Sequence, residues 1–414
     1  MTASTALRLA APLALALALG PLACGTAPNG VLARPVAETV LQPVVDGILA
    51  AFDTHPLVGI GDSHGLPQQT QQMELYATIL RDPRFAGTVG NVVVEFGAAG
   101  RQDVIDRYVA GETVPYQELR TVWTDTVGWL PTAGQLTVAQ FFAAVRGINQ
   151  TLPPGDHIRV WLGEPPIDWP AVESRKDAKP AMSRRDSHPA GIIVEHILAR
   201  GEKALVIYGG QHFRDATPYL LGPVPTPFML PSLRSLVEDE YPGTFFIVLP
   251  YSELHAPGSC DQLREKASRA WPPPVLAAPA RAGAPDPVLR GCATIDQADW
   301  VARGLLTLSG VKPSKVRGDA VLFLDPAADA RLSPMLPDFF LEADYRREVA
   351  RRFEIQHGRP LCSLPEDFSL ERAAYDVDLD APGYAELLHA LFARHDLNQD
   401  GVVTRSEYTD PIPR

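Results

Sequence analysis

Six runs of apolar residues, separated by segments with helical spacing, constrain the fold of this 414-residue chain more than any other feature. In chain order the runs are "LVGIGDSH", "NVVVEFG", "IRVWLGEP", "ALVIYGGQHF", "TFFIVLPY" and "AVLFLDP". Segments such as "QTQQMELYATILRD" and "TVAQFFAAVRGIN" repeat apolar residues at the period of an amphipathic helix. Near-continuous apolar strands that alternate with helices are typical of a parallel sheet buried on both faces. The sequence therefore predicts an α/β fold, with a mainly parallel β-sheet and helices on both faces.

Polar residues collect where these runs end. They are Asp62, Ser63, His64, Glu95, Glu164, Gln211 and His212. In an open α/β sheet, parallel strands place their carboxyl ends along one edge, and ligands bind at that edge. One polar residue at a strand end is ordinarily a loop residue with satisfied hydrogen bonds, but the recurrence of His and Glu predicts a shared site.

Two of the runs end in the same pattern, G-x-x-H. "GDSH" carries His64 and "GGQH" carries His212, and the glycine allows a sharp turn over the sheet edge. Glu95 is the best candidate carboxylate, because burying an unpaired acid at the end of an apolar run is costly. The three residues allow either a general base that activates water or a divalent metal site with open positions. For one histidine alone, a core histidine bonded to backbone is the simpler interpretation.

A third element is the segment "MSRRDSHPAGIIVEHILARGEK", which predicts a helix leading into the second G-x-x-H strand. Arg185, just before this helix, could hold an anionic substrate group or a developing oxyanion. Asp186 could cap the start of the helix, which is the purely structural alternative. His188 is interpreted as a residue of the helix start rather than as a ligand.

The motifs "GDSHG", "VVVEFG", "RRDSHPAGIIVEHIL" and "ALVIYGGQHF" resemble, in the same order, those of the erythromycin esterase, ChaN, Tiki and TraB superfamily. The resemblance covers roughly residues 40 to 250 and implies an α/β sandwich with one active-site edge. It implies that the catalytic residues are His64, Glu95, Arg185, Asp186 and His212. Because members are esterases, metal-dependent proteases or haem-binding uptake proteins, it implies a hydrolase with an unknown small-molecule or peptide substrate. The alternatives are haem or metal binding without turnover, or a calcium-stabilised surface protein with a degenerate site.

Two departures from this pattern bear on the reaction. Esterase-like members usually have Glu where this chain has Asp62, and a further Glu soon after the histidine, where this chain has Gln68. The missing carboxylate weakens the expectation of macrolide esterase activity. Glu74 could substitute for it, although a surface position on the following helix is the simpler interpretation.

The segment "DLNQDGVVTRSE" near the C-terminus matches a twelve-residue EF-hand calcium loop, with Gly401 at the sharp turn. The predicted calcium ligands are Asp396, Asn398, Asp400, Val402 through its carbonyl, Thr404 and Glu407. Only "YTDPIPR" follows, where Pro411 would end an exit helix, and no second loop is visible. We therefore expect weak, structural binding of Ca²⁺ at the millimolar concentrations found outside the cytoplasm.

The N-terminus predicts export. One charge, Arg8, precedes the apolar segment "LAAPLALALALGPLA", which is short for a permanent membrane anchor. Cys24 in "GPLAC" could carry the lipid anchor of a bacterial lipoprotein, although Pro21 is atypical of such signals. We expect a protein of the periplasm or cell envelope, without a transmembrane helix in the mature chain.

These signals predict the following division of the chain: a signal peptide over 1–24, an α/β domain over 36–255, a Pro/Ala-rich loop over 256–290, a continuation of the α/β domain over 291–378, and a single EF-hand over 380–414. A disulfide among Cys260, Cys292 and Cys362 is plausible in an oxidising compartment, with its pairing open. The net charge of −12 and the lack of a basic run argue against a nucleic-acid partner.

Overall fold

The computed structural model describes residues 41–62, 69–128, 136–213, 216–218, 229–250, 275–277, 294–296, 315–323, 342–357, 367–369 and 402–404. All of them belong to the second of the two units into which the chain divides, Met1–Thr39 and Val40–Arg414. Several predictions fall outside the described residues: the signal peptide, the four cysteines, His64, Gln68, and the calcium loop apart from 402–404.

The centre of the fold is a seven-stranded sheet in the order β3-β2-β4-β1-β7-β11-β8. Its strands are β1 (Leu57–Asp62), β2 (Asn91–Ala98), β3 (Arg159–Glu164), β4 (Ala204–Gly209), β7 (Phe245–Pro250), β8 (Val275–Ala277) and β11 (Ala320–Phe323). Neighbours from β3 to β11 are parallel, and β8 pairs antiparallel with β11 at the edge. The six predicted apolar runs are the six parallel strands, which confirms the α/β fold with a mainly parallel sheet.

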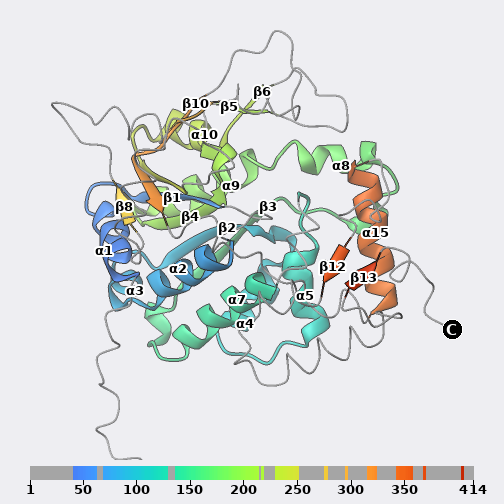
Figure 1. The fold of residues 1–414 in the computed structure, drawn as a ribbon. Helices are drawn as coiled ribbons and strands as arrows, with labels where there is room; N and C mark the ends of the chain where they lie inside the picture. Colours follow the sequence, from blue (N-terminus) through green and yellow to red (C-terminus); the bar gives the residue numbers. More distant parts are fainter. Residues whose placement is uncertain are drawn as a thin grey trace, which may run out of the picture. The chain divides into compact units, whose positions relative to one another are not determined.

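Helices cover both faces of the sheet (Figure 1). One face carries α1 (Gln42–Ala51), α2 (Gln69–Arg81), α3 (Pro83–Thr88), α4 (Gln102–Val109), α5 (Tyr116–Thr124) and α7 (Leu136–Asn149). The other carries α9 (Ser187–Ile192), the π-helical turn η4 (Ile193–Ile197) and α10 (Leu233–Glu240). Side chains alternate between the two cores, as in β2, where Val92 and Val94 face the first set and Val93 the second. This double burial explains why the strands read as continuous apolar runs.

Short elements connect these layers. They are the 3₁₀ turns η1 (Ala99–Arg101), η2 (Pro154–Asp156), η3 (Trp169–Ala171), η5 (Leu198–Arg200) and η6 (Gly210–Phe213), and the helix α8 (Arg175–Met182). Side-chain caps mark the starts of two helices. Ser174 and Asp177 form a capping box at α8, and the Ser232 side chain accepts from Ser235 N–H at the start of α10.

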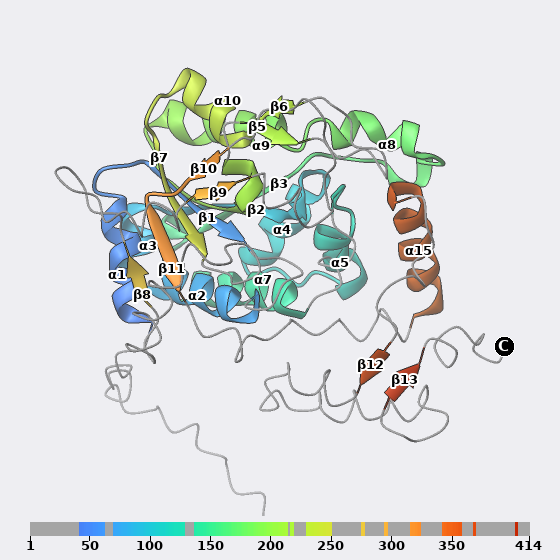
Figure 2. The same ribbon diagram turned by 45° about the horizontal axis from the view of Figure 1, so that its top comes forward.

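A further helix, α15 (Ala343–His357), lies beside α8 (Figure 2). Three two-stranded antiparallel sheets complete the described structure: β5 (Ala216–Pro218) with β6 (Met229–Pro231), β9 (Thr294–Asp296) with β10 (Lys315–Arg317), and β12 (Asp367–Ser369) with β13 (Val402–Thr404). In the last of them Phe368 is opposite Val403.

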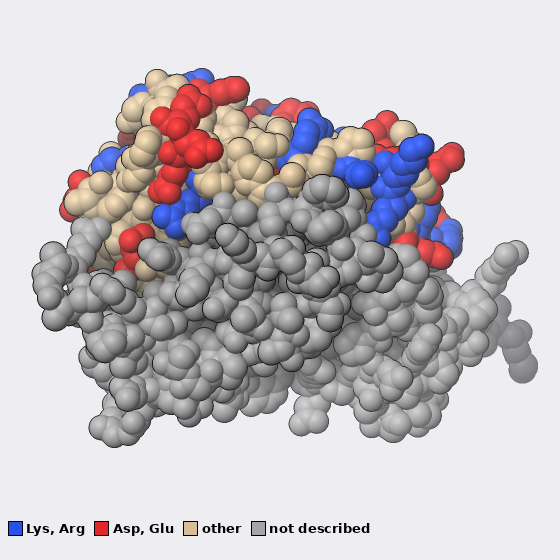
Figure 3. Space-filling view, turned by 90° about the horizontal axis from the view of Figure 1, so that it is seen from above, with Lys and Arg blue, Asp and Glu red and all other residues tan. Residues whose placement is uncertain are grey.

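Acidic and basic side chains are both present on the described part of the surface seen in Figure 3. Among the described helices, none has the length and apolar character needed to cross a bilayer.

Candidate functional site

The register of the sheet places the first residues of the two G-x-x-H segments at the ends of neighbouring strands. β1 and β4 are parallel neighbours, and Asp62 at the end of β1 is paired with Gly209 at the end of β4. The chain continues from Gly209 into η6, which carries His212. Asp62 and Gly209 therefore end adjacent strands at the same edge of the sheet, and His64, two residues after Asp62 in the sequence, lies outside the described residues.

Glu95, on β2, is the centre of a buried ionic network and is 4% exposed. Its Oε1 accepts from Arg185 Nη2 at 2.6 Å and lies 3.2 Å from His212 Nε2. Its Oε2 accepts from the Gly209 N–H at 2.6 Å. One carboxylate therefore ties an arginine, a histidine and the end of β4 together.

Glu164, at the end of β3, holds Arg185 from its other side. Its Oε1 accepts from Arg185 Nε at 2.7 Å, and its Oε2 accepts from the Val127 N–H at 3.1 Å. The Arg185 guanidinium also packs against the backbone of Gly128, where an added Cβ would overlap it. The sequence placed Glu164 at a strand end but not among the catalytic residues, because its partner Arg185 is 21 positions away.

Asp186 occupies the N-cap position of α9 but makes no side-chain cap hydrogen bond. Its Oδ1 instead lies 2.8 Å from His212 Nδ1 and accepts from the Leu233 N–H at 2.7 Å. The carboxylate therefore orients His212 and joins η6 to the start of α10. The structural alternative, in which the Asp186 side chain caps α9, is therefore wrong.

The two carboxylates on His212 set its protonation. Burial opposes the charged imidazole, but the charges of Asp186 and Glu95 outweigh it and raise the pKa of His212 to about 10. His212 is then an imidazolium near neutral pH, with each ring nitrogen donating to a carboxylate. A metal or haem bound at His212 would have to displace one of these protons.

Burial and neighbouring charges also shift the pKa values of Glu164 and Arg185. Burial raises the pKa of Glu164, although Arg185 opposes the effect. The charges of Glu164 and Glu95 outweigh burial at Arg185 and raise the pKa of its guanidinium further. The side chain of Arg185 is 20% exposed, against 4% or less for the two glutamates. Arg185 is thus the cation of this network that reaches toward solvent.

Other residues singled out in the sequence lie nearby or elsewhere. The Asp62 carboxylate accepts from Tyr76 Oη at 3.1 Å, and Gln72 donates to the Gly61 carbonyl at 3.1 Å, so α2 holds the end of β1. Glu74, on the same helix, is exposed, as its surface interpretation predicts. His188 is the second residue of α9, and burial lowers the pKa of its imidazole.

No cluster of three or more His, Cys, Asp or Glu side chains suited to a metal ion occurs among the described residues. Of the proposed ligands at the sheet edge, His64 is not described, while Glu95 and His212 are bonded to each other. The calcium ligands also lie outside the described side chains; the backbone of Val402 and Thr404 belongs to β13.

Comparison with known proteins gives weak likenesses. No family model matches the chain, and no curated protein matches it significantly. A structure of the type III effector HopBA1 is similar with a TM-score of 0.29 and 14% identity, over 52% of this chain and 84% of that one. A crystal structure of a Bacillus cereus protein is similar with a TM-score of 0.37 and 10% identity, over 68% of this chain and 97% of that one. Likenesses this weak carry no functional argument, so the chemistry rests on the residues of the site.

Proposed function

We propose that the α/β domain is a hydrolase whose active site lies where β3, β2, β4 and β1 end. The observation that carries this proposal is the buried network in which Glu95 binds both Arg185 and His212. Buried ion pairs are weak contributors to stability, because desolvation offsets most of their attraction. Five ionisable side chains gathered at the ligand-binding edge of a parallel sheet are therefore better explained by chemistry than by packing.

The roles follow from the contacts. His64, beyond the end of β1, is proposed as the base that takes a proton from water. Arg185, fixed by two carboxylates and partly exposed, is proposed to stabilise the negative charge that develops on the substrate. Glu95 and Asp186 orient Arg185 and His212, since their oxygens are already bonded to these cations.

The test is hydrolysis of ester and peptide panels by the mature chain. We expect His64→Ala to lower the rate by about 10²- to 10⁴-fold. His55→Ala is the matched control, because His55 precedes β1 at the opposite end of the same strand. Arg185→Lys should also lose about 100-fold, since lysine keeps the charge but not the fork between two carboxylates. Equal rates for His64→Ala and His55→Ala would refute the catalytic role.

A binding protein without turnover is the alternative, with haem or a divalent metal at the same edge. Metal analysis and haem absorbance of the purified chain separate it from the hydrolase. Tight binding that His64→Ala abolishes, with no hydrolysis by wild type, would support the binder. If the chain neither binds haem or metal nor hydrolyses any substrate, the remaining alternative is a surface protein with a degenerate site.

We also propose that the chain binds Ca²⁺ through Asp396–Glu407. The twelve-residue pattern supports this, and so does β13, because Val402–Thr404 are positions 7 to 9 of the loop and form a short strand. Ca²⁺ at about 100 times its Kd would stabilise the fold by about 2.7 kcal/mol, seen as a rise in melting temperature. Glu407→Ala should abolish that rise, while Asp410→Ala, just beyond the loop, should keep it.

Export to the periplasm or cell envelope, with lipid attached at Cys24, is proposed from the N-terminal sequence. Fractionation of cells expressing the full chain tests it. Release from the membrane fraction by Cys24→Ala would support the lipid anchor, and unchanged distribution would refute it.

A further inference from the structure

The network at the sheet edge is connected to α15 through a segment without regular secondary structure, Asp125–Gly128, which follows α5. Within it, the Val127 N–H donates to Glu164 at 3.1 Å, and Gly128 lies against the Arg185 guanidinium. Val127 is fully buried. The position of this segment therefore decides where Glu164 and Arg185 can sit.

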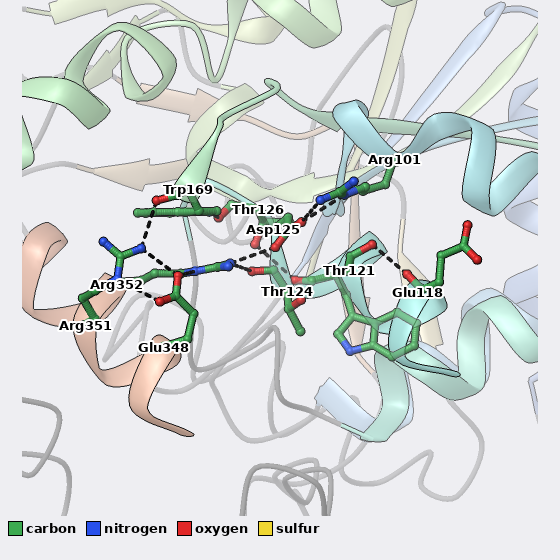
Figure 4. A network of polar contacts seen from close by, with 11 residues as sticks. Arg101, Glu118, Thr121, Thr124, Asp125, Thr126, Trp169, Glu348, Arg351 and Arg352 are labelled. Atoms are coloured by element: carbon green, nitrogen blue, oxygen red, sulfur yellow. Dashed lines mark hydrogen bonds and ion pairs between the residues drawn. The ribbon is translucent and has the colours of Figure 1, made fainter. Parts of the chain in front are cut away.

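Helix α15 bonds the start of the same segment through Arg352, which reaches Asp125 (Figure 4). Arg352 Nη1 donates to the Thr124 carbonyl and to Asp125 Oδ1, each at 2.9 Å. Gln356, which is 4% exposed, donates to the Val127 carbonyl through its side-chain amide. The Val127 residue is thus bonded at its N–H to the site and at its C=O to α15.

Further hydrogen bonds surround this contact between α15 and Asp125–Gly128. Asp125 Oδ2 accepts from Arg101 Nε at 2.9 Å and Nη2 at 2.7 Å, and Arg101 belongs to η1, directly after the strand that carries Glu95. Glu348, one turn before Arg352, accepts from Arg352 Nε at 2.7 Å and from Arg351 Nη2 at 2.7 Å. Arg351 in turn donates to the Trp169 carbonyl at 2.9 Å.

We propose that Arg352 and Gln356 are positioning residues of the active site, which act through Asp125–Gly128 on Glu164 and Arg185. Neither touches the ionic network itself. They replace the intra-segment hydrogen bonds that a helix or strand would supply, so that a loop can present an N–H to a buried carboxylate with fixed geometry. This inference rests on the proposed function of the site, and its first readouts need no substrate.

The experiment compares Gln356→Ala and Arg352→Ala with Arg347→Ala in the full chain. Arg347 is the matched control, because it lies on the same helix, is 72% exposed and pairs only with Asp344 among the described residues. Hydrogen exchange of a peptide covering 124–128 should become at least about tenfold faster in the two test variants and not in the control. Exchange in β4 should stay unchanged in all three. Arg352→Lys, which keeps a donor, should give a smaller effect and covers the case in which the alanine variant does not fold.

A second readout separates positioning from general stability. In protein labelled at arginine, the Nε–H of Arg185 reports its bond to Glu164, and we expect its exchange with solvent to quicken at least about tenfold in Gln356→Ala. Unchanged exchange at 124–128 and at Arg185 would overturn the proposal, as would a uniform increase over the whole sheet. Altered exchange in a chain that hydrolyses nothing would keep the positioning role and reject the hydrolase instead.

Discussion

At the scale of single residues, the site depends on the balance of charge around Glu95. Two cations, Arg185 and His212, share its Oε1, and both are held again by a second carboxylate, Glu164 or Asp186. Each charge is compensated only while its partners remain, since the groups are largely removed from water. Removing Glu95 therefore leaves Arg185 and His212 with one carboxylate each and takes away the group that joins them.

Glu95→Gln tests this balance with little change in shape. We expect the free energy of unfolding to fall by about 3 kcal/mol, because Arg185 and His212 keep their charges but lose their common partner. Chemical denaturation measures the loss. Glu74→Gln, on the exposed face of α2, is the control and should change stability by less than about 0.5 kcal/mol. Equal effects of the two substitutions would show that the charge of Glu95 does not stabilise the fold.

The pH dependence of stability follows from His212. Its pKa is about 10 in the folded protein, above the ordinary value of 6.5. The folded state binds more protons than the unfolded state between these values, so stability falls as the pH rises from about 6.5 to 10 and is fully present below that window. The slope approaches about 1.4 kcal/mol per pH unit. Urea midpoints at pH 7 and pH 9.5 should differ more in wild type than in His212→Gln; parallel pH curves for the two proteins would contradict the assignment.

At the scale of elements, the strands were predictable and their partners were not. Apolar runs identify β1, β2 and β4 because strands buried on both faces need apolar residues at nearly every position. The same runs do not specify the order β3-β2-β4-β1, which depends on how the helices pack. The edge rule brought Glu95 and His212 together, and the structure places them 3.2 Å apart.

Two contributions could not be predicted from the sequence. Glu164 enters the site through Arg185, and the pairing depends on where the turn before α9 lies, which no local pattern specifies. Gln356 and Arg352 bond backbone carbonyls, and a carbonyl acceptor exists at every position of a chain, so it leaves no signature. The proposed role of His64 stays a prediction.

The turn after α5 offers a test at this scale. At Gly128 a methyl group would overlap the Arg185 guanidinium, so Gly128→Ala should lower the free energy of unfolding by about 1–3 kcal/mol and shift the signal of Arg185. Gly147→Ala, within α7, meets open space and should raise stability by about 0.5–1 kcal/mol, because alanine favours the helix. Destabilisation by both would point to a general intolerance of the fold rather than to contact with Arg185.

At the scale of the whole chain, the proposed calcium loop is joined to another part of the sequence through backbone pairing. β13 lies within the loop sequence, and its antiparallel partner β12 is Asp367–Ser369, ten residues after the end of α15. A ligand that orders the loop also orders the strand bonded to it. Calcium binding at 396–407 should therefore protect amides that lie about 30 positions earlier in the chain.

Hydrogen exchange with and without Ca²⁺ measures this link. We expect exchange in a peptide covering 367–369 to slow about tenfold or more on addition of millimolar Ca²⁺, together with that of 402–404. Glu407→Ala should remove both effects, since the loop loses its bidentate ligand, and Asp410→Ala should keep them. Protection confined to 402–404 would mean that calcium binds without β12. Protection of 367–369 that persists in Glu407→Ala would place the ion elsewhere, because this variant lacks the bidentate ligand of the loop.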